Sequence, residues 1–107
     1  MNYKIIPTPN FQKEFKKLSK KYPSLKADLI ELTHSLLEHP VQGDEVFKNC
    51  YKIRFSIKSK NKGKSGGGRL INYVQIVSEK IYLLSVYDKS EKETVSDQYI
   101  KFLLKDL

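Results

Sequence analysis

The chain has 107 residues, of which 39% are hydrophobic and 11% aromatic, so it can build the core of one domain but is too short for two. The net charge is +8. A single cysteine, Cys50, excludes an internal disulfide and a thiolate zinc ribbon, and we expect it to be a small buried thiol. No stretch approaches the roughly 20 apolar residues that cross a bilayer and the N-terminus lacks a secretory signal, so we expect one cytoplasmic domain over residues 1–107 with no membrane contact.

The first half of the sequence predicts a short strand followed by two helices. Residues 2–6 have the composition of an opening strand. Thr8 and the proline after it supply an N-cap and a first helical residue, and apolar side chains then recur at helical spacing over 9–22. The same spacing repeats over 25–38 and ends at a His-Pro pair. The two segments predict an antiparallel helical hairpin.

The second half changes to the apolar period of strands. Residues 51–58 alternate apolar and polar or cationic side chains, whereas 69–77 and 81–87 are apolar on both faces, as in the middle of a sheet. The Lys-, Ser- and Gly-rich residues 58–68 predict a mobile connection. Ser96 caps a last amphipathic helix. The order β-α-α-β-β-β-α predicts an α+β fold, with a small antiparallel sheet covered on one face by the helical hairpin and the C-terminal helix.

Positive charge is concentrated in one third of the chain. Residues 46–78 contain no acidic residue, while the rest of the chain holds twelve basic and twelve acidic residues. A segment of one sign attracts polyanions, and a solvated lysine-rich loop is the plain alternative. The eight basic residues of the segment are Lys48, Lys52, Arg54, Lys58, Lys60, Lys62, Lys64 and Arg69.

The alternation over 51–58 predicts a cationic sheet face. Because side chains alternate with period two, Lys52, Arg54 and Lys58 are expected on the same face. A hairpin neighbour beginning at Arg69 brings a further guanidinium close to them. Such crowded cations repel one another unless an anion is present. Lysine with a lowered pKa can act as a base and arginine can clamp phosphate, so this face has the chemistry for RNA cleavage by the 2′-hydroxyl.

Other motifs point to no cofactor and no metal. Residues 63–65 (Gly-Lys-Ser) suggest a phosphate loop, but the pattern needs a glycine five residues before the Gly-Lys pair, where the chain has Lys58. His34 and His39 fall on or at the end of the second predicted helix, away from the cationic strand. The segment 46–78 offers no carboxylate for a paired-acid site.

Three segments of the second half form a combined pattern. They are residues 51–54 (Tyr-Lys-Ile-Arg), 63–73 (the Gly-Lys-Ser-Gly-Gly-Gly-Arg run and the strand after it) and 81–92 (Ile-Tyr-Leu-Leu-Ser-Val-Tyr-Asp-Lys-Ser-Glu-Lys). Together they resemble the RelE/HigB-type toxins of bacterial type II toxin–antitoxin pairs, in the RelE/ParE superfamily. The resemblance covers 50–96 well, and the N-terminal hairpin agrees in arrangement.

This resemblance implies a RelE-like fold and a defined activity. The family member would be a ribosome-dependent mRNA endoribonuclease that cuts codons in the A site and inhibits translation. Its partners would be a cognate antitoxin, the ribosome with its rRNA, and mRNA. Operator DNA would be contacted only through the toxin–antitoxin complex.

The resemblance also implies catalytic roles for four cationic residues. Arg54 would hold the RNA phosphate, and Arg69 would stabilise the transition state. Lys89 matches a basic position that acts as acid or phosphate ligand, and Lys64 matches a recurrent basic position in the loop. Tyr87 stands near the position where some members carry an acid–base residue, and the general base is not assigned.

Plain alternatives exist for these residues. The two arginines could form structural salt bridges with Asp88 or Glu91, and Lys89 could be solvated. The lysines expected to bind RNA are Lys52, Lys58, Lys60, Lys62 and Lys92.

Two rival functions share the predicted fold or charge. A ParE-like toxin poisons DNA gyrase without a nuclease site, although such a protein does not require the cationic face. A non-catalytic nucleic-acid-binding module could stack bases on Tyr73 or Tyr82, although both lie in apolar strands where core packing is the plainer role.

Overall fold

The computed structural model describes residues 2–92, 94–105 and 107. No helix within that part of the chain is long and apolar enough to span a bilayer. The elements, in chain order, are β1 (Lys4–Pro7), α1 (Pro9–Lys21), α2 (Leu25–Glu38), β2 (Asp44–Phe47), β3 (Cys50–Phe55), the 3-10 turn η1 (Lys58–Lys60), β4 (Gly68–Gln75), β5 (Lys80–Asp88) and α3 (Asp97–Leu104).

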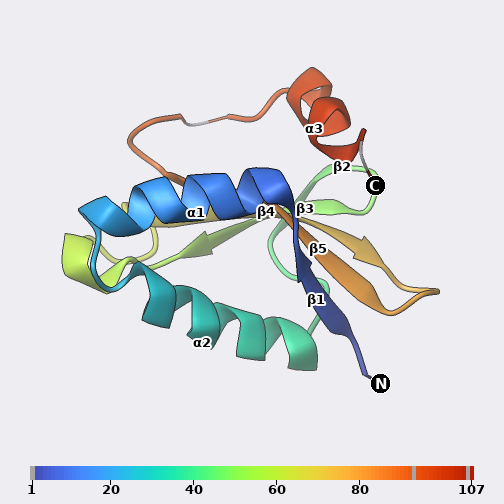
Figure 1. Cartoon of the computed structure of the whole chain (residues 1–107), viewed down its shortest axis with the longest axis horizontal. Helices are drawn as coiled ribbons and strands as arrows, with labels where there is room; N and C mark the ends of the chain where they lie inside the picture. The colour runs from blue at the N-terminus through green and yellow to red at the C-terminus, as the bar shows by residue number, and fades with distance from the viewer. Residues whose placement is uncertain (1, 93, 106) are drawn as a thin grey trace.

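The α+β fold class and the helical hairpin are confirmed. Helices α1 and α2 pack against one side of a five-stranded sheet with the strand order β1-β5-β4-β3-β2 (Figure 1). Thr8 caps α1 as predicted, because its hydroxyl accepts a hydrogen bond from the Phe11 amide at 3.3 Å. The same hydroxyl donates to the Leu83 carbonyl at 2.8 Å, which fastens the start of α1 to β5.

The sheet is mixed, whereas the sequence predicted it to be antiparallel. Strand β1 runs parallel to β5, with Ile5 opposite Ile81. Apolar alternation specifies which residues face the core but not strand direction, so the sequence pattern could not show this pairing. Strand β2 was also not predicted, because Asp44–Phe47 is short and does not alternate; it pairs with β3 through a tight turn in which Asn49 has a φ of 62°.

Helices cover both faces of the sheet, so the expectation of one covered face is wrong. Helix α3 lies on the side opposite α2 (Figure 1). Ile100 and Leu103 of α3 pack in a second core cluster with Ile71 and Leu84. The physical reason lies in the central strands, since strands that are apolar on both faces need cover on both.

The cationic connection after β3 begins as an ordered turn against α2. Strand β3 ends at Phe55, and the amide of Lys58 donates to the Asp28 carboxylate at 3.1 Å. The amide of Ser59 donates to the hydroxyl of Ser24 at 2.8 Å. The predicted strand over 51–58 therefore stops three residues early.

Cys50 is fully buried, as the sequence predicted. Burial raises the pKa of its thiol to about 11, and the negative charge of Glu45 adds to the rise. We expect Cys50 to resist a thiol reagent such as DTNB in the folded protein at neutral pH and to react fully in denaturant. Rapid labelling of the native protein would contradict this burial.

Candidate phosphate-binding site

Two arginines and a tyrosine are cross-strand neighbours on the side of the sheet that also carries α3. Arg54 of β3 pairs with Arg69 of β4, and Arg69 pairs with Tyr87 of β5. Residues opposite one another in antiparallel strands have Cβ atoms about 5 Å apart on the same face. The predicted proximity of the two arginines is therefore confirmed, and Lys52, two residues before Arg54, shares their face. Arg54 is exposed, whereas Arg69 is 6% exposed.

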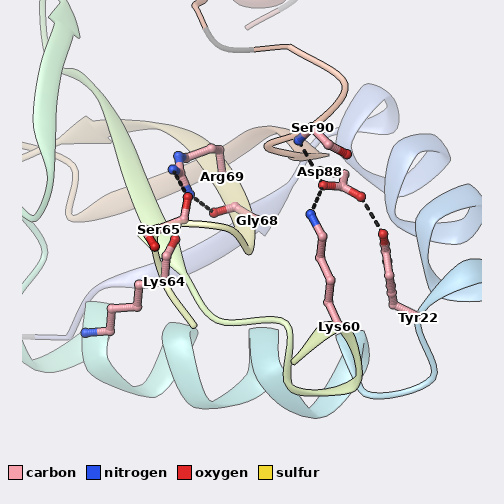
Figure 2. Close-up of polar contacts among 8 residues, drawn as sticks. All are labelled: Tyr22, Lys60, Lys64, Ser65, Gly68, Arg69, Asp88 and Ser90. Carbon is pink, nitrogen blue, oxygen red and sulfur yellow. Dashed lines mark hydrogen bonds and ion pairs between the residues drawn. The ribbon is translucent and has the colours of Figure 1, made fainter. Parts of the chain in front are cut away.

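The Arg69 guanidinium is held by the glycine-rich loop that precedes it. Its Nη1 donates to the carbonyls of Lys64 and Gly68, both at 2.9 Å, and its Nη2 donates to the Ser65 carbonyl at 3.0 Å (Figure 2). A guanidinium has five N–H donors, so two remain without a protein partner among the described residues. The loop thus orients Arg69 and leaves part of its donor set free for a ligand.

The glycines make this loop geometry possible. A Cβ at Gly67 would lie 2.3 Å from the Phe55 carbonyl oxygen, and one at Gly68 would lie 2.4 Å from Cζ of the Phe55 ring. No side chain fits in that space. Backbone of the loop therefore packs directly on the end of β3 and turns its carbonyls toward Arg69.

Electrostatics on this face favour a bound anion. Burial lowers the pKa of Arg69, and the positive charge of Arg54 lowers it further. Burial raises the pKa of Tyr87, although Arg69 partly opposes the rise. The Tyr87 hydroxyl is buried, is kept protonated, and has no hydrogen-bond partner in the described part of the chain. An anion placed here would offset the repulsion between the arginines.

Lys92 adds a third cation beside Tyr87. Its Nζ lies 5.2 Å from the centroid of the Tyr87 ring and 4.7 Å from that of Tyr99 in α3, both within cation–π range. In the sequence, Tyr99 lies in the amphipathic helix that Ser96 is predicted to cap. No local pattern could reveal this contact, because packing of α3 against β5 creates it.

Lys58 does not share the arginine face, which corrects its predicted grouping with Lys52 and Arg54, and Lys60 is paired elsewhere. Lys58 forms an exposed ion pair with Glu31 of α2, 3.0 Å between Nζ and Oε2. Because β3 ends at Phe55, the period-two alternation does not extend to Lys58. Lys60 is mostly buried and forms an ion pair with Asp88 (Figure 2).

The remaining predicted lysines surround the glycine-rich loop without joining Arg69 directly. The Lys64 side chain points away from the guanidinium (Figure 2) and lines, with Arg54, a hollow of about 270 Å³ against α2. Lys89 is half-buried, and its amide donates to the Gly67 carbonyl at 3.0 Å. Lys62 is exposed.

Asp88 ends β5 and pairs in the sheet register with Gly68 of β4. Its buried carboxylate accepts hydrogen bonds from Lys60 Nζ and the Tyr22 hydroxyl, both at 2.5 Å, and from the Ser90 amide at 3.0 Å. Burial alone raises the pKa of Asp88, but these hydrogen bonds outweigh it and hold the pKa well below its ordinary value. Asp88 is thus bonded to Lys60, Tyr22 and Ser90. The alternative in which an arginine forms a structural salt bridge with Asp88 is not seen in the described part of the chain. That part also contains no cluster of three His, Cys, Asp or Glu side chains that could hold a metal.

Comparison with known proteins identifies the fold. No protein-family model matches the sequence. A mutant of the E. coli toxin RelE in the free state matches all of this chain and 99% of its own at 22% identity, with a TM-score of 0.60. The isolated E. coli RelE toxin matches 98% of this chain and 99% of its own at 26% identity, with a TM-score of 0.54.

A third match comes from a toxin–antitoxin complex. A chain from the intact E. coli RelBE toxin–antitoxin complex matches 80% of this chain and 95% of its own length at 28% identity, with a TM-score of 0.54. These similarities agree with the RelE-like fold that the sequence resemblance implied. The chain thus has a RelE-like fold and is similar over most of its length to RelE toxins, one of them in a toxin–antitoxin complex.

Proposed function

We propose that this toxin is a ribosome-dependent endoribonuclease that inhibits translation by cutting mRNA in the A site. The observation that carries the proposal is the pair Arg54 and Arg69, adjacent on one sheet face, with Tyr87 as the next cross-strand neighbour. Neither arginine forms an ion pair with an acidic residue in the described part of the chain. This arrangement suits a phosphate group whose negative charge increases in the transition state.

The reaction follows from the chemistry of RNA. The 2′-hydroxyl loses its proton and attacks the adjacent phosphorus, the bond to the 5′-oxygen breaks, and that oxygen takes up a proton. Arg54 would hold the phosphate, and Arg69 would stabilise the charge of the phosphorane. The Tyr87 hydroxyl and the Lys89 ammonium would serve the leaving oxygen, and Lys64 would bind the flanking strand. Because these groups are modest acids and bases, the ribosome would supply the positioning.

Regulation by an antitoxin completes the proposal. E. coli RelE occurs in a complex with its antitoxin, and the cognate antitoxin of this chain would hold it inactive in the same way. Contact with operator DNA would then occur only through that complex.

The test is a bacterial cell-free translation reaction with the purified toxin. Primer extension maps the mRNA ends with and without ribosomes, and we expect cuts within translated codons only when ribosomes are present. Arg54→Ala should lower the cutting rate at least tenfold with unchanged thermal stability, because the side chain is exposed. Lys26→Ala, an exposed lysine of α2, serves as the matched control and should cut normally.

Intact mRNA with normal protein synthesis would refute the nuclease. Inhibition of gyrase supercoiling by the same preparation would then favour the ParE-like function. Cutting by Arg54→Ala at the normal rate would remove this arginine from the site.

A further inference from the structure

A second cationic surface lies on α1, outside the basic segment 46–78. A groove of about 790 Å³ opens between α1 and the residues that end β5 and follow it. Its floor includes Leu18, Val86 and Tyr87. In Figure 1 the connection from β5 to α3 rises beside α1, above the sheet. The groove is bordered by five lysines: Lys13, Lys17, Lys20, Lys21 and Lys92.

Helical spacing aligns the lysines of α1 along the groove. Lys13, Lys17 and the pair at 20–21 follow one another at intervals of about one turn, with a rise of 1.5 Å per residue. Lys13 and Lys21 are thus about 12 Å apart along the axis. All four are exposed, while Leu18 of the same helix is buried. This row of charges suits a ligand that repeats its negative charge.

The groove keeps most of this charge unneutralised. Two acidic residues, Glu14 and Glu91, line it. Oε1 of Glu14 accepts hydrogen bonds from Asn10, from the Ser85 hydroxyl at 2.7 Å and from the Val86 amide at 3.3 Å, so this carboxylate is committed to the edge of β5. In the described part of the chain none of the five groove lysines forms an ion pair. The resulting field attracts a polyanion.

The groove is continuous with the arginine face. Tyr87, whose buried hydroxyl lacks a partner within the described residues, lines the groove and is also the cross-strand neighbour of Arg69. A strand whose phosphate lies at Arg69 would therefore continue past Tyr87 toward Lys92 and α1. An acidic peptide has no reason to follow this path, since the arginine face on which it would end suits a phosphate rather than a run of carboxylates.

We propose that the groove between α1 and residues 86–92 binds the phosphate backbone of the single-stranded RNA that leads from the cleavage site. The direction of the strand rests on the proposed nuclease function, whereas binding itself requires no catalysis. A positively charged groove that follows the backbone is a common design for binding single-stranded nucleic acid.

The test measures affinity for a fluorescent single-stranded 2′-O-methyl RNA of about twelve nucleotides, which cannot be cleaved, as a function of salt. The groove variant is Lys13→Gln/Lys17→Gln. The control is Lys16→Gln/Lys26→Gln, which removes the same charge from exposed lysines that do not line the groove. Glutamine and lysine have similar helix propensities, so both variants should fold.

The expected result is a change of salt dependence. Two lost phosphate contacts lower the slope of log K against log salt by about 1.4, so between about 50 and 200 mM salt the groove variant loses about sevenfold less affinity than the wild type. The control should keep the wild-type slope. Equal slopes for the two variants would overturn the proposal.

Two further probes separate the RNA strand from other polyanions. The proposal would also be overturned if the groove variant lost affinity for a duplex RNA hairpin but not for the single strand. It would likewise be overturned if the variant lost affinity for poly-L-glutamate but not for RNA. Because the probe cannot be cut, an inactive toxin with the expected slopes would refute the proposed nuclease and leave the groove standing. Normal mRNA cutting together with equal salt slopes for the two variants would refute the groove and leave the proposed nuclease standing.

Discussion

Replacing Arg69 by alanine is expected to lower mRNA cutting at least a hundredfold and to abolish toxicity, because the variant loses the charge that would stabilise the phosphorane. The buried side chain also bonds three loop carbonyls. Their loss should lower the free energy of unfolding by about 1–3 kcal/mol. Primer extension measures the first effect, and denaturant unfolding measures the second.

A second substitution separates charge from loop geometry at this position. Arg69→Gln removes the positive charge and keeps a neutral N–H₂ donor in the buried site. Its stability should lie nearer the wild type than that of Arg69→Ala, with cutting equally low. Full toxicity of either variant at equal expression would exclude Arg69 from catalysis. Recovery of cutting in Arg69→Gln would reduce its role to loop support.

Replacing Asp88 by alanine is expected to be the most destabilising substitution outside the apolar core, by about 3–5 kcal/mol. The change leaves Lys60 mostly buried without its counter-charge and leaves the Tyr22 hydroxyl without its acceptor. Tyr22→Phe is the matched control, since it removes one hydrogen bond to a charged group and should cost about 1.5–3 kcal/mol. A loss for Asp88→Ala no larger than that for Tyr22→Phe would contradict the buried ion pair.

The same carboxylate predicts how stability depends on pH. The folded pKa of Asp88 lies well below the ordinary value of 3.8, so folding favours the ionised form. Its stabilising contribution is complete above pH 3.8 and is lost as the pH falls below that value toward the folded pKa. Asp88→Asn should therefore show a shallower fall in unfolding free energy than the wild type between about pH 4 and pH 2.

The arginine site shows where sequence reasoning succeeds. Alternation in β3 and the strand beginning at Arg69 placed Arg54 and Arg69 on one face, and the register confirms it. Alternation is a local property, so it can be recognised in the sequence without knowledge of the fold. The same reasoning failed for Lys58, because contacts with α2 end the strand at Phe55 and no residue of β3 itself signals that end.

The lysines of α1 have a helical spacing that is visible in the sequence. Their spacing over residues 13–21 places them on one side of a helix. The net charge does not reveal this side, because acidic residues elsewhere in the chain balance these lysines. Only the fold shows that this side meets the end of β5 and forms a groove. The partner of Lys60 was equally hidden, since Asp88 lies 28 residues away.

The sequence by itself determined the helices, the central strands, the α+β class and the cationic character of β3, because periodicity, capping and net charge act over a few residues. The tertiary structure alone decided the parallel pairing of β1, the position of α3 on the second face, the loop carbonyls that hold Arg69 and the burial of Lys60 against Asp88. Each of these depends on contacts between segments that meet only when the chain is folded. Their energies come from burial and packing, which no local pattern records.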